Sequence, residues 1–291
     1  MSAIDWVVTA AGLLLVATAL REVFHTLLHP SGIGQLTHAI FGVIWRAARR
    51  LGGRASALAG PLAVVSTIVM WTLMIVLGWA LVYWPQMPEA FQVAEGIQAS
   101  EQDDLLDAVY LSAVALSTLG FGDIVAEQTA LRIALVVEAL VGFALLSAAI
   151  SWVLSIYPAL MRRRALASRI NALVTGDGDQ ARLVEGDPPC VLALVLHNLS
   201  EQLHTVGVDL VQYPSSYFFH GPAADLSLPP ALWRLQHALA RDDVPPEAEA
   251  AATALRGSLS AVGDTLRRGS FRLRANDAQA ALHAYAADHE R

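Results

Sequence analysis

Two long apolar stretches limit this chain to a small set of folds. Leu62 to Trp84 contains no charged side chain, and Leu131 to Leu160 is a second apolar run of 30 residues. An α-helix rises about 1.5 Å per residue, so either run can cross a hydrocarbon core about 30 Å thick. The chain is 55% hydrophobic with a mean hydropathy of +0.48, which is too apolar for an ordinary soluble protein. The sequence therefore predicts a membrane protein with these two helices as its strongest spans.

A shorter apolar segment, Leu105 to Ser117, lies between the two runs. As a helix it is about 20 Å long and cannot cross the bilayer, so it must enter the membrane and return. Backbone that is not helical is tolerated at that depth only when it is buried in protein or lines water. Asp103 and Asp104 suit the N-terminus of this short helix. Its C-terminus would direct partial negative charge at a central cavity, which favours a cation.

The residues that follow read Ser-Thr-Leu-Gly-Phe-Gly-Asp and place glycine at alternate positions. A lining that replaces the water around a cation needs successive carbonyl groups on one axis, and this requires backbone angles of alternating hand. Gly120 and Gly122 reach positive φ without steric cost. Thr118 adds a hydroxyl oxygen, and the side chains of Leu119 and Phe121 are expected to point away and pack behind the lining. The pattern predicts an ion-selectivity filter over residues 118–122; the alternative is a glycine-containing turn between two membrane helices.

The stretch resembles the potassium-channel signature Thr-Val-Gly-Tyr-Gly-Asp, with Leu119 in place of Val and Phe121 in place of Tyr. Phe at this place is similar to the filters of two-pore-domain and several bacterial potassium channels. The resemblance covers residues 62–160. It implies an outer helix, a pore helix, a filter and an inner helix at 62–84, 105–117, 118–122 and 131–160.

The resemblance also implies the ligands and the assembly. The only bound species expected is the permeant K⁺, with no cofactor. One filter strand per chain cannot surround an ion, so we expect a homotetramer with cyclic symmetry. The K⁺ ligands would be backbone and hydroxyl oxygens of the filter, contributed by Thr118, Leu119, Gly120, Phe121 and Gly122.

Support for the filter departs from the family pattern. Val114 stands where several bacterial channels carry a Glu that bonds to the Asp after the filter, which is Asp123 here. Tyr110 and Leu111 stand where many channels have a Trp pair that anchors that Asp. Glu138 lies inside the inner helix, where an ionisable group is costly, and we expect it to brace the pore helix rather than contact ions. The residues expected to support the filter are Val114, Ser117, Asp123 and Glu138.

Gly142 lies 22 residues after Gly120, and this spacing resembles that of the inner-helix hinge glycine of potassium channels. It is therefore the candidate gating hinge. The alternative is a small residue that allows close helix packing. Ser147 and Ser151 are candidate hydroxyl groups of the cavity.

The N-terminal region consists of two segments. Residues 1–30 predict a transmembrane helix that is interrupted by Arg21 and Glu22; the alternative is a helix at the membrane interface. Residues 31–60 repeat apolar side chains at helical spacing before an arginine cluster, which predicts an amphipathic segment at the cytoplasmic membrane surface. The alternative there is a plain linker helix.

Arginine distribution predicts the topology. Clusters precede the first strong span and follow the last, so both flanks should be cytoplasmic, in the cell (inner or plasma) membrane. The loops between the spans are acidic and face outward, where they would concentrate cations. The net charge of −7 argues against a nucleic-acid partner. The acidic residues of these loops are Glu89, Glu95, Glu101, Asp103, Asp104, Asp107, Asp123 and Glu127.

The tail, residues 161–291, predicts a helical cytoplasmic domain without a run of strands. Gly176 to Ala181 fits a short nucleotide-binding pattern, but the helix that such a site needs is broken at once by Gly186 and two prolines. His197 and His204 share a helix face, as a surface pair or a metal site. No regulatory ligand can be named. The expected helices are Pro189 to Asp209, Ala231 to Arg241, Pro246 to Arg268 and Asn276 to His289.

The expected fold is an all-α membrane protein, a tetrameric channel of outer helix, pore helix, filter and inner helix, with an extra N-terminal helix and a helical cytoplasmic domain. The expected function is passive, potassium-selective conduction. Two alternatives stay open: a non-selective cation channel of the same architecture, and a non-conducting membrane sensor or regulatory subunit. No nucleophile–base pair, metal cluster or phosphate loop in the tail supports an enzyme.

Overall fold

The computed structural model describes residues 2–27, 33–52, 54–93, 104–176, 180–183, 188–221, 223–241, 244–269, 271, 273 and 275–289. The chain divides into two compact units. The apolar unit comprises Met1–His29, Gly34–Thr37 and Val65–Val153. The C-terminal unit comprises Pro30–Ile33, His38–Val64 and Leu154–Arg291. The four segments expected from the sequence are thus grouped into two.

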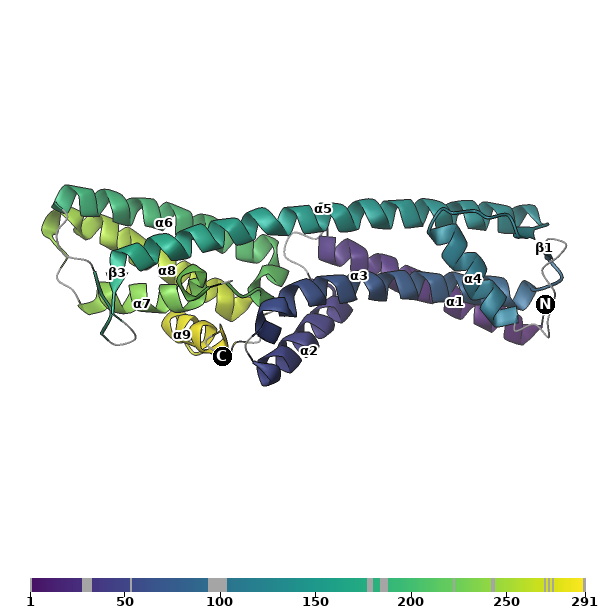
Figure 1. Ribbon diagram of the computed structural model, residues 1–291, viewed down its shortest axis with the longest axis horizontal. Coiled ribbons are helices and arrows are strands. Elements are labelled where there is room, and N and C mark those ends of the chain that lie inside the picture. The colour runs from purple at the N-terminus through teal and green to yellow at the C-terminus, as the bar shows by residue number, and fades with distance from the viewer. Residues whose placement is uncertain are drawn as a thin grey trace. The chain divides into compact units, whose positions relative to one another are not determined.

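Helices dominate both units (Figure 1). Among the described residues, three helices are long and apolar enough to cross a membrane, which confirms the expected all-α membrane fold. Strand β1 pairs with β2 and β3 with β4, each antiparallel. In chain order the elements are α1 Ala3–Leu27, α2 Gln35–Leu51, α3 Arg54–Tyr83, the 3₁₀ turn η1 Trp84–Gln86, β1 Phe91–Val93, α4 Asp104–Leu116, β2 Ile124–Ala126, α5 Thr129–Leu173, β3 Val174–Thr175, β4 Arg182–Leu183, α6 Pro189–Gln212, the 3₁₀ turns η3 Pro214–Phe218 and η4 Ala224–Leu226, α7 Leu228–Arg241, α8 Pro246–Arg268 and α9 Ala278–His289.

The three candidate spans are α1, α3 with η1, and α5. Helix α1 packs against α3 through glycines: a Cβ on Gly12 would lie 2.4 Å from the carbonyl oxygen of Gly78. A Cβ on Gly78 would lie 2.6 Å from a methyl of Val16. Small residues let backbones approach where lipid offers no hydrophobic driving force between helices. Helix α1 is therefore a packed member of the apolar unit.

The acidic residue that interrupts α1, Glu22, has a structural explanation. Glu22 is buried, and its carboxylate accepts hydrogen bonds from the backbone N–H groups of Gln35 at 3.0 Å and Leu36 at 3.1 Å. These N–H groups belong to the first turn of α2 and have no partner within that helix. The carboxylate also lies at the positive end of the α2 dipole. Glu22 thus caps α2 from the neighbouring helix.

Two helix boundaries differ from expectation. Helix α3 begins at Arg54 rather than residue 62, although Pro61 lies inside it, and α5 continues to Leu173 rather than ending at residue 160, although Pro158 lies inside it. A proline removes one backbone hydrogen bond and crowds the preceding turn. The expectation for α5 was wrong because the residues beyond Pro158 are buried in the C-terminal unit, and this packing outweighs the lost bond. The buried residues include Ala159, Leu160, Leu166, Ala167 and Ile170.

The C-terminal unit is built on α6 and α8, which lie side by side (Figure 1). Helix α8 has the expected bounds, α6 runs three residues further than expected, and α9 begins two residues later. Helix α7 begins at Leu228 rather than at Ala231 because two prolines stand in its first turn, where a missing N–H costs nothing. The predicted tail helices are therefore all present.

The described ends of the Gly176 to Ala181 pattern lie next to strands β3 and β4. Strands β3 and β4 form a short antiparallel pair around it. Gly176 has φ +82, and a Cβ there would lie 2.6 Å from the carbonyl oxygen of Gln180. Gly176 is therefore required by its φ angle and by the close approach of Gln180. The pattern's middle residues, 177–179, lie outside the described residues.

The apolar face of α2 is covered by protein, not by lipid as expected. Phe41 is fully buried, and Trp45 is 5% exposed. The Trp45 ring stacks on His220 at 4.6 Å and meets Phe218 edge-on at 5.7 Å. An amphipathic helix needs some apolar partner for its face. Here the partner is the C-terminal unit, so the linker-helix alternative is nearer to the structure.

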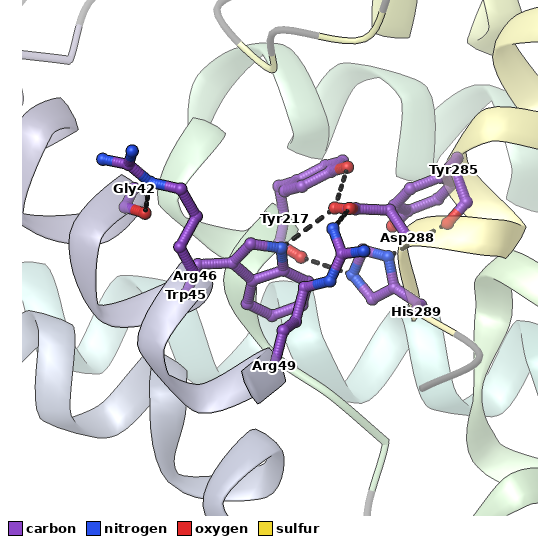
Figure 2. Close-up of polar contacts among 8 residues, drawn as sticks. All are labelled: Gly42, Trp45, Arg46, Arg49, Tyr217, Tyr285, Asp288 and His289. Carbon is purple, nitrogen blue, oxygen red and sulfur yellow. Dashed lines mark hydrogen bonds and ion pairs between the residues drawn. The ribbon is translucent and has the colours of Figure 1, made fainter. Parts of the chain in front are cut away.

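Asp288 holds α2 to α9 in the C-terminal unit, as Figure 2 shows. It accepts hydrogen bonds from Trp45 Nε1 at 3.0 Å and Tyr217 Oη at 2.8 Å, and it forms an ion pair with Arg49. The neighbouring His289 has its Nδ1 3.0 Å from the carbonyl oxygen of Tyr285 and its Nε2 2.9 Å from that of Tyr217. This cluster is referred to below as the Asp288 cluster.

Candidate functional site

The candidate site begins where α4 ends. The N–H groups of Ser117, Thr118 and Leu119 still donate to carbonyl oxygens of the last turn of α4, at 3.0 to 3.1 Å. Residues 118–122 therefore follow α4 directly, with no linker between them. Residues 118–122 start at the C-terminal, partially negative end of the helix dipole.

The backbone of the loop alternates in hand. Thr118 has φ +59, Gly120 has φ +57 and Gly122 has φ +76. The described residues contain no other non-glycine residue with positive φ, and a left-handed conformation at a β-branched side chain costs about 1–3 kcal/mol. A Cβ at either glycine would meet nothing within 4 Å. The glycines are thus required by their φ angles and not by crowding.

The side chains of Leu119 and Phe121 do not pack behind the loop within one chain. They are 60% and 62% exposed. The expectation that they pack behind the filter concerns the assembled channel and stays a prediction, because the described part of one apolar unit does not cover them. Two large apolar side chains that are exposed two positions apart leave an apolar surface on the single chain.

Asp123 is anchored by a residue that sequence reasoning did not assign to this role. The Tyr110 hydroxyl donates to Asp123 Oδ2, while Asp123 Oδ1 accepts from the N–H of Ile124 at 3.1 Å. Val114 is buried in α4 and, as an apolar residue, forms no charged pair with Asp123. A tyrosine on the pore helix, one turn before Val114, was the signal that could have found this contact. Ser117 donates to the carbonyl oxygen of Val114 at 3.2 Å.

The segment after the loop is tied back to the end of α3. Strand β2 pairs with β1, with Ala126 opposite Phe91. The N–H of Glu127 donates to the carbonyl oxygen of Ala90 at 2.9 Å, and Arg132 Nε donates to that of Ala126 at 2.8 Å. Both ends of residues 117–123 are therefore fixed. Of the expected acidic residues, Glu95, Glu101 and Asp103 lie outside the described residues.

Glu138 joins three helices. Its side chain is fully buried in α5. It accepts a hydrogen bond from the Tyr83 hydroxyl of α3 at 2.8 Å and another from the Ser112 hydroxyl of α4. The Ser112 hydroxyl also lies 3.0 Å from the carbonyl oxygen of Val76. The carboxyl group thus contacts the pore helix and not the loop, and buried polar groups of this kind need such partners.

Gly142 lies against the C-terminal end of α4. A Cβ there would lie 1.9 Å from the carbonyl oxygen of Leu116, and α5 continues through this position as a helix. Close packing, the alternative left open by the sequence, therefore explains this glycine. Its role as a hinge stays a prediction.

One face of α5 has no partner among the described residues of the apolar unit. Ser147 lies on this face, and its hydroxyl donates to the carbonyl oxygen of Phe143 at 2.9 Å. Ser151 is also exposed. No three His, Cys, Asp or Glu side chains of the described ranges converge on a metal position. The large exposed side chains of the face are Ile133, Val136, Val137, Leu140, Phe143, Leu146 and Ile150.

Comparison with known proteins agrees with this geometry. A protein of Bacillus subtilis (strain 168), described as the uncharacterized membrane protein YdjJ, is 25% identical over 167 residues, which cover 56% of this chain and 48% of that protein. The chain thus spans about half the length of this curated relative. No solved structure matches this chain. Residues 66–157 match the family described as "Ion channel". This region, which holds most of α3, all of α4 and the first part of α5, is therefore similar to that ion channel family.

Proposed function

We propose that the protein is a potassium-selective channel in which four copies surround one pore. The observation that carries this proposal is the alternation of hand at Thr118, Gly120 and Gly122, directly after the carboxyl end of α4. Such a backbone turns successive carbonyl oxygens toward one side, where they replace the hydration shell of a cation. The α4 dipole adds partial negative charge at the inner end of the loop.

Assembly into a tetramer supplies the partners that one chain lacks. Leu119 and Phe121 are exposed beside the filter, and α5 exposes a continuous apolar face. In a cyclic tetramer the neighbouring copies cover Leu119 and Phe121, while the α5 faces meet around the cavity. Ser147 and Ser151 then offer hydroxyl groups to the water-filled part of the pore.

The sidedness follows from charge. Arginines of α2 and of the second half of α5 mark the cytoplasmic side, so the C-terminal unit is cytoplasmic and the loops around the filter face outward. Glu89, Asp104, Asp107 and Glu127 then lie at the outer mouth and raise the local concentration of cations. The membrane is the cell (inner or plasma) membrane.

Phe121 distinguishes the potassium-selective proposal from a non-selective channel. The potassium-channel signature has an aromatic residue at this place, and Phe121 keeps that feature, which supports potassium selectivity. The bi-ionic reversal potential of purified protein in liposomes tests this point. We expect a potential set by K⁺, and a marked shift toward zero for Phe121→Asp. A wild-type potential indifferent to the exchange of K⁺ for Na⁺ would support the non-selective alternative.

The same liposomes test whether the chain conducts at all. A membrane sensor or regulatory subunit would give no K⁺ flux when purified alone. A channel gives flux that stops when the K⁺ gradient is removed. Absence of flux across a range of pH would favour the sensor alternative.

A further inference from the structure

Helix α2 has two opposite faces, and one of them is buried in the C-terminal unit. The buried residues follow one another at intervals of four and three positions, and they are Phe41, Trp45 and Ala48. The exposed face of α2 lies on the other side of the helix. It carries Leu36, Val43 and Leu51, which are 41%, 56% and 79% exposed. A surface helix needs one apolar stripe for its packing, so these three side chains are left without an explanation.

The exposed face of α2 also carries positive charge. Arg46 and Arg50 lie three and seven positions after Val43, so they share its side of the helix, and both are exposed. Within the described part of the chain neither guanidinium forms an ion pair, and α2 itself contains no Asp or Glu. Figure 2 shows Arg46 directed away from the Asp288 cluster, into which Arg49 of the same helix reaches. The two arginines are therefore available to a partner outside the chain.

The chain connections of α2 place this face beside the membrane. Helix α2 lies between two candidate spans, α1 and α3, and is not itself one, so both of its ends are tied to the same membrane surface. Only residues 52 and 53 separate its last residue, Leu51, from Arg54 of α3, and two residues reach about 7 Å at most. Helix α3 already exposes a large apolar side chain at Leu58. The apolar exposed surface of the span thus begins close to the end of α2.

We propose that the exposed face of α2 docks on the bilayer surface and binds anionic phospholipids. Arg46 and Arg50 bind the headgroup phosphates, and Leu36 and Val43 enter the boundary between headgroups and acyl chains. On the proposed topology this is the cytoplasmic leaflet, whose lipids give the surface a negative potential. A soluble anion would occupy the arginines but leave the apolar side chains in water. The inference needs only the membrane location of α1 and α3, and it goes beyond ion conduction.

A fluorescent probe on this face tests the contact with lipid. On a Cys190→Ala background, full-length Val43→Cys is labelled with bimane and placed in vesicles that contain a doxyl lipid as a short-range quencher. We expect strong quenching in vesicles of phosphatidylcholine and phosphatidylglycerol, and about half of it or less in phosphatidylcholine alone. Thr253→Cys, at an exposed position of α8, is the matched control and should be quenched little in either.

Two results of this experiment overturn the proposal. One is a probe at Val43→Cys that lipid does not quench, and the other is equal quenching in the two kinds of vesicle. Disulfide crosslinking of unlabelled Val43→Cys between copies would assign the face to a neighbouring subunit, and this result also contradicts docking on lipid.

Removal of the charges tests the role of the arginines. Arg46→Gln with Arg50→Gln should lower the quenching at Val43→Cys to its value in phosphatidylcholine alone, because each arginine near an anionic surface raises the affinity about fivefold. Arg267→Gln with Arg268→Gln removes the same charge from α8 and should leave the quenching unchanged. Thermal unfolding of both double variants checks that they fold. Equal quenching in the two double variants contradicts the inference.

Potassium flux in vesicles without the quencher separates this inference from the proposed function. Flux without quenching at Val43→Cys refutes the docking of α2 and leaves the channel intact. Quenching without flux keeps the docking and refutes the channel.

Discussion

The two units of this chain each surround a carboxylate with hydrogen-bond donors, but the donors differ; Glu138 is fully buried, whereas the Asp288 side chain is 18% exposed. In the apolar unit, Glu138 is bound by the hydroxyls of Tyr83 and Ser112, which are neutral donors. In the C-terminal unit, Asp288 is bound by the Arg49 guanidinium together with an indole N–H and a phenol. A cation inside the apolar unit would itself need compensation, whereas the second unit can keep Arg49 partly solvated.

The difference has consequences for substitution. Removing a carboxylate held by hydroxyls leaves neutral groups without partners. Removing one held by arginine also leaves a charge without compensation, which costs more. The four predictions below test this comparison, from the largest expected effect to the smallest.

Asp288→Ala should give the largest effect on stability, about 3 kcal/mol, because Arg49, Trp45 and Tyr217 all lose their acceptor. Thermal unfolding of the purified full-length protein measures it. The matched control is Glu249→Ala, which breaks the exposed pair with Arg256 and should cost about 0.5 kcal/mol or less. If the two substitutions lowered thermal stability equally, the Asp288 cluster would be worth no more than an exposed ion pair, and the comparison would be wrong.

Glu138→Ala should cost about 2 kcal/mol, because it leaves the buried Tyr83 hydroxyl without its acceptor and opens a small cavity, while Ser112 keeps the carbonyl oxygen of Val76. Glu138→Gln keeps an acceptor for Tyr83 and should retain most of the stability and the K⁺ flux. Flux and thermal stability of both variants check this prediction. If Glu138→Gln proved as damaging as Glu138→Ala, the description of Glu138 as an acceptor for neutral hydroxyl groups would be wrong.

Acid should weaken the C-terminal unit through His289. Burial is the main cause that lowers the pKa of His289, and burial also lowers that of His220. In the unfolded chain the histidine binds a proton as the pH falls below about 6.5, whereas in the folded unit it stays neutral. The stability that comes from the neutral histidine is therefore present above that pH and is lost as the pH falls below it.

His289 should remove about 2 kcal/mol between pH 7.5 and pH 5, because burial lowers its pKa to about 3, below this range. Unfolding measured at both pH values should show a smaller loss for His289→Gln than for wild type. His204→Gln, at an exposed position, should leave the difference unchanged. An identical loss in all three proteins would remove His289 from the account.

Tyr110→Phe should have the smallest effect on stability, because Tyr110 is 39% exposed and Asp123 keeps the N–H of Ile124. We expect a modest fall in the K⁺ to Na⁺ permeability ratio and no change in assembly. Tyr157→Phe, on an exposed face of α5, is the control. A ratio unchanged by Tyr110→Phe would show that this hydroxyl does not hold the filter.

The backbone conformation of residues 118–122 could be predicted from the sequence because its pattern is local. Alternate glycines at 120 and 122 require alternate φ angles, and the bounds of α4 follow from the length of one apolar run. Pro158 pointed to the end of a helix, but packing that the sequence does not display carries α5 past it.

The polar contacts between distant segments could not be predicted. Asp288 lies 243 residues from Trp45, and no spacing rule connects them. Glu22 was an unexplained charge until the N-terminus of α2 proved to lie beside it. Such contacts arise from the tertiary fold, which decides where an orphan donor meets an acceptor.

Potassium flux through Gly120→Ala, compared with Gly257→Ala, tests the central claim most directly. Gly120 has positive φ, whereas Gly257 lies in α8 with open space around it and no such angle. We predict that Gly120→Ala abolishes flux while the tetramer persists, and that Gly257→Ala conducts as wild type does. Robust flux through Gly120→Ala tetramers would contradict coordination of the ion by the carbonyls of this loop.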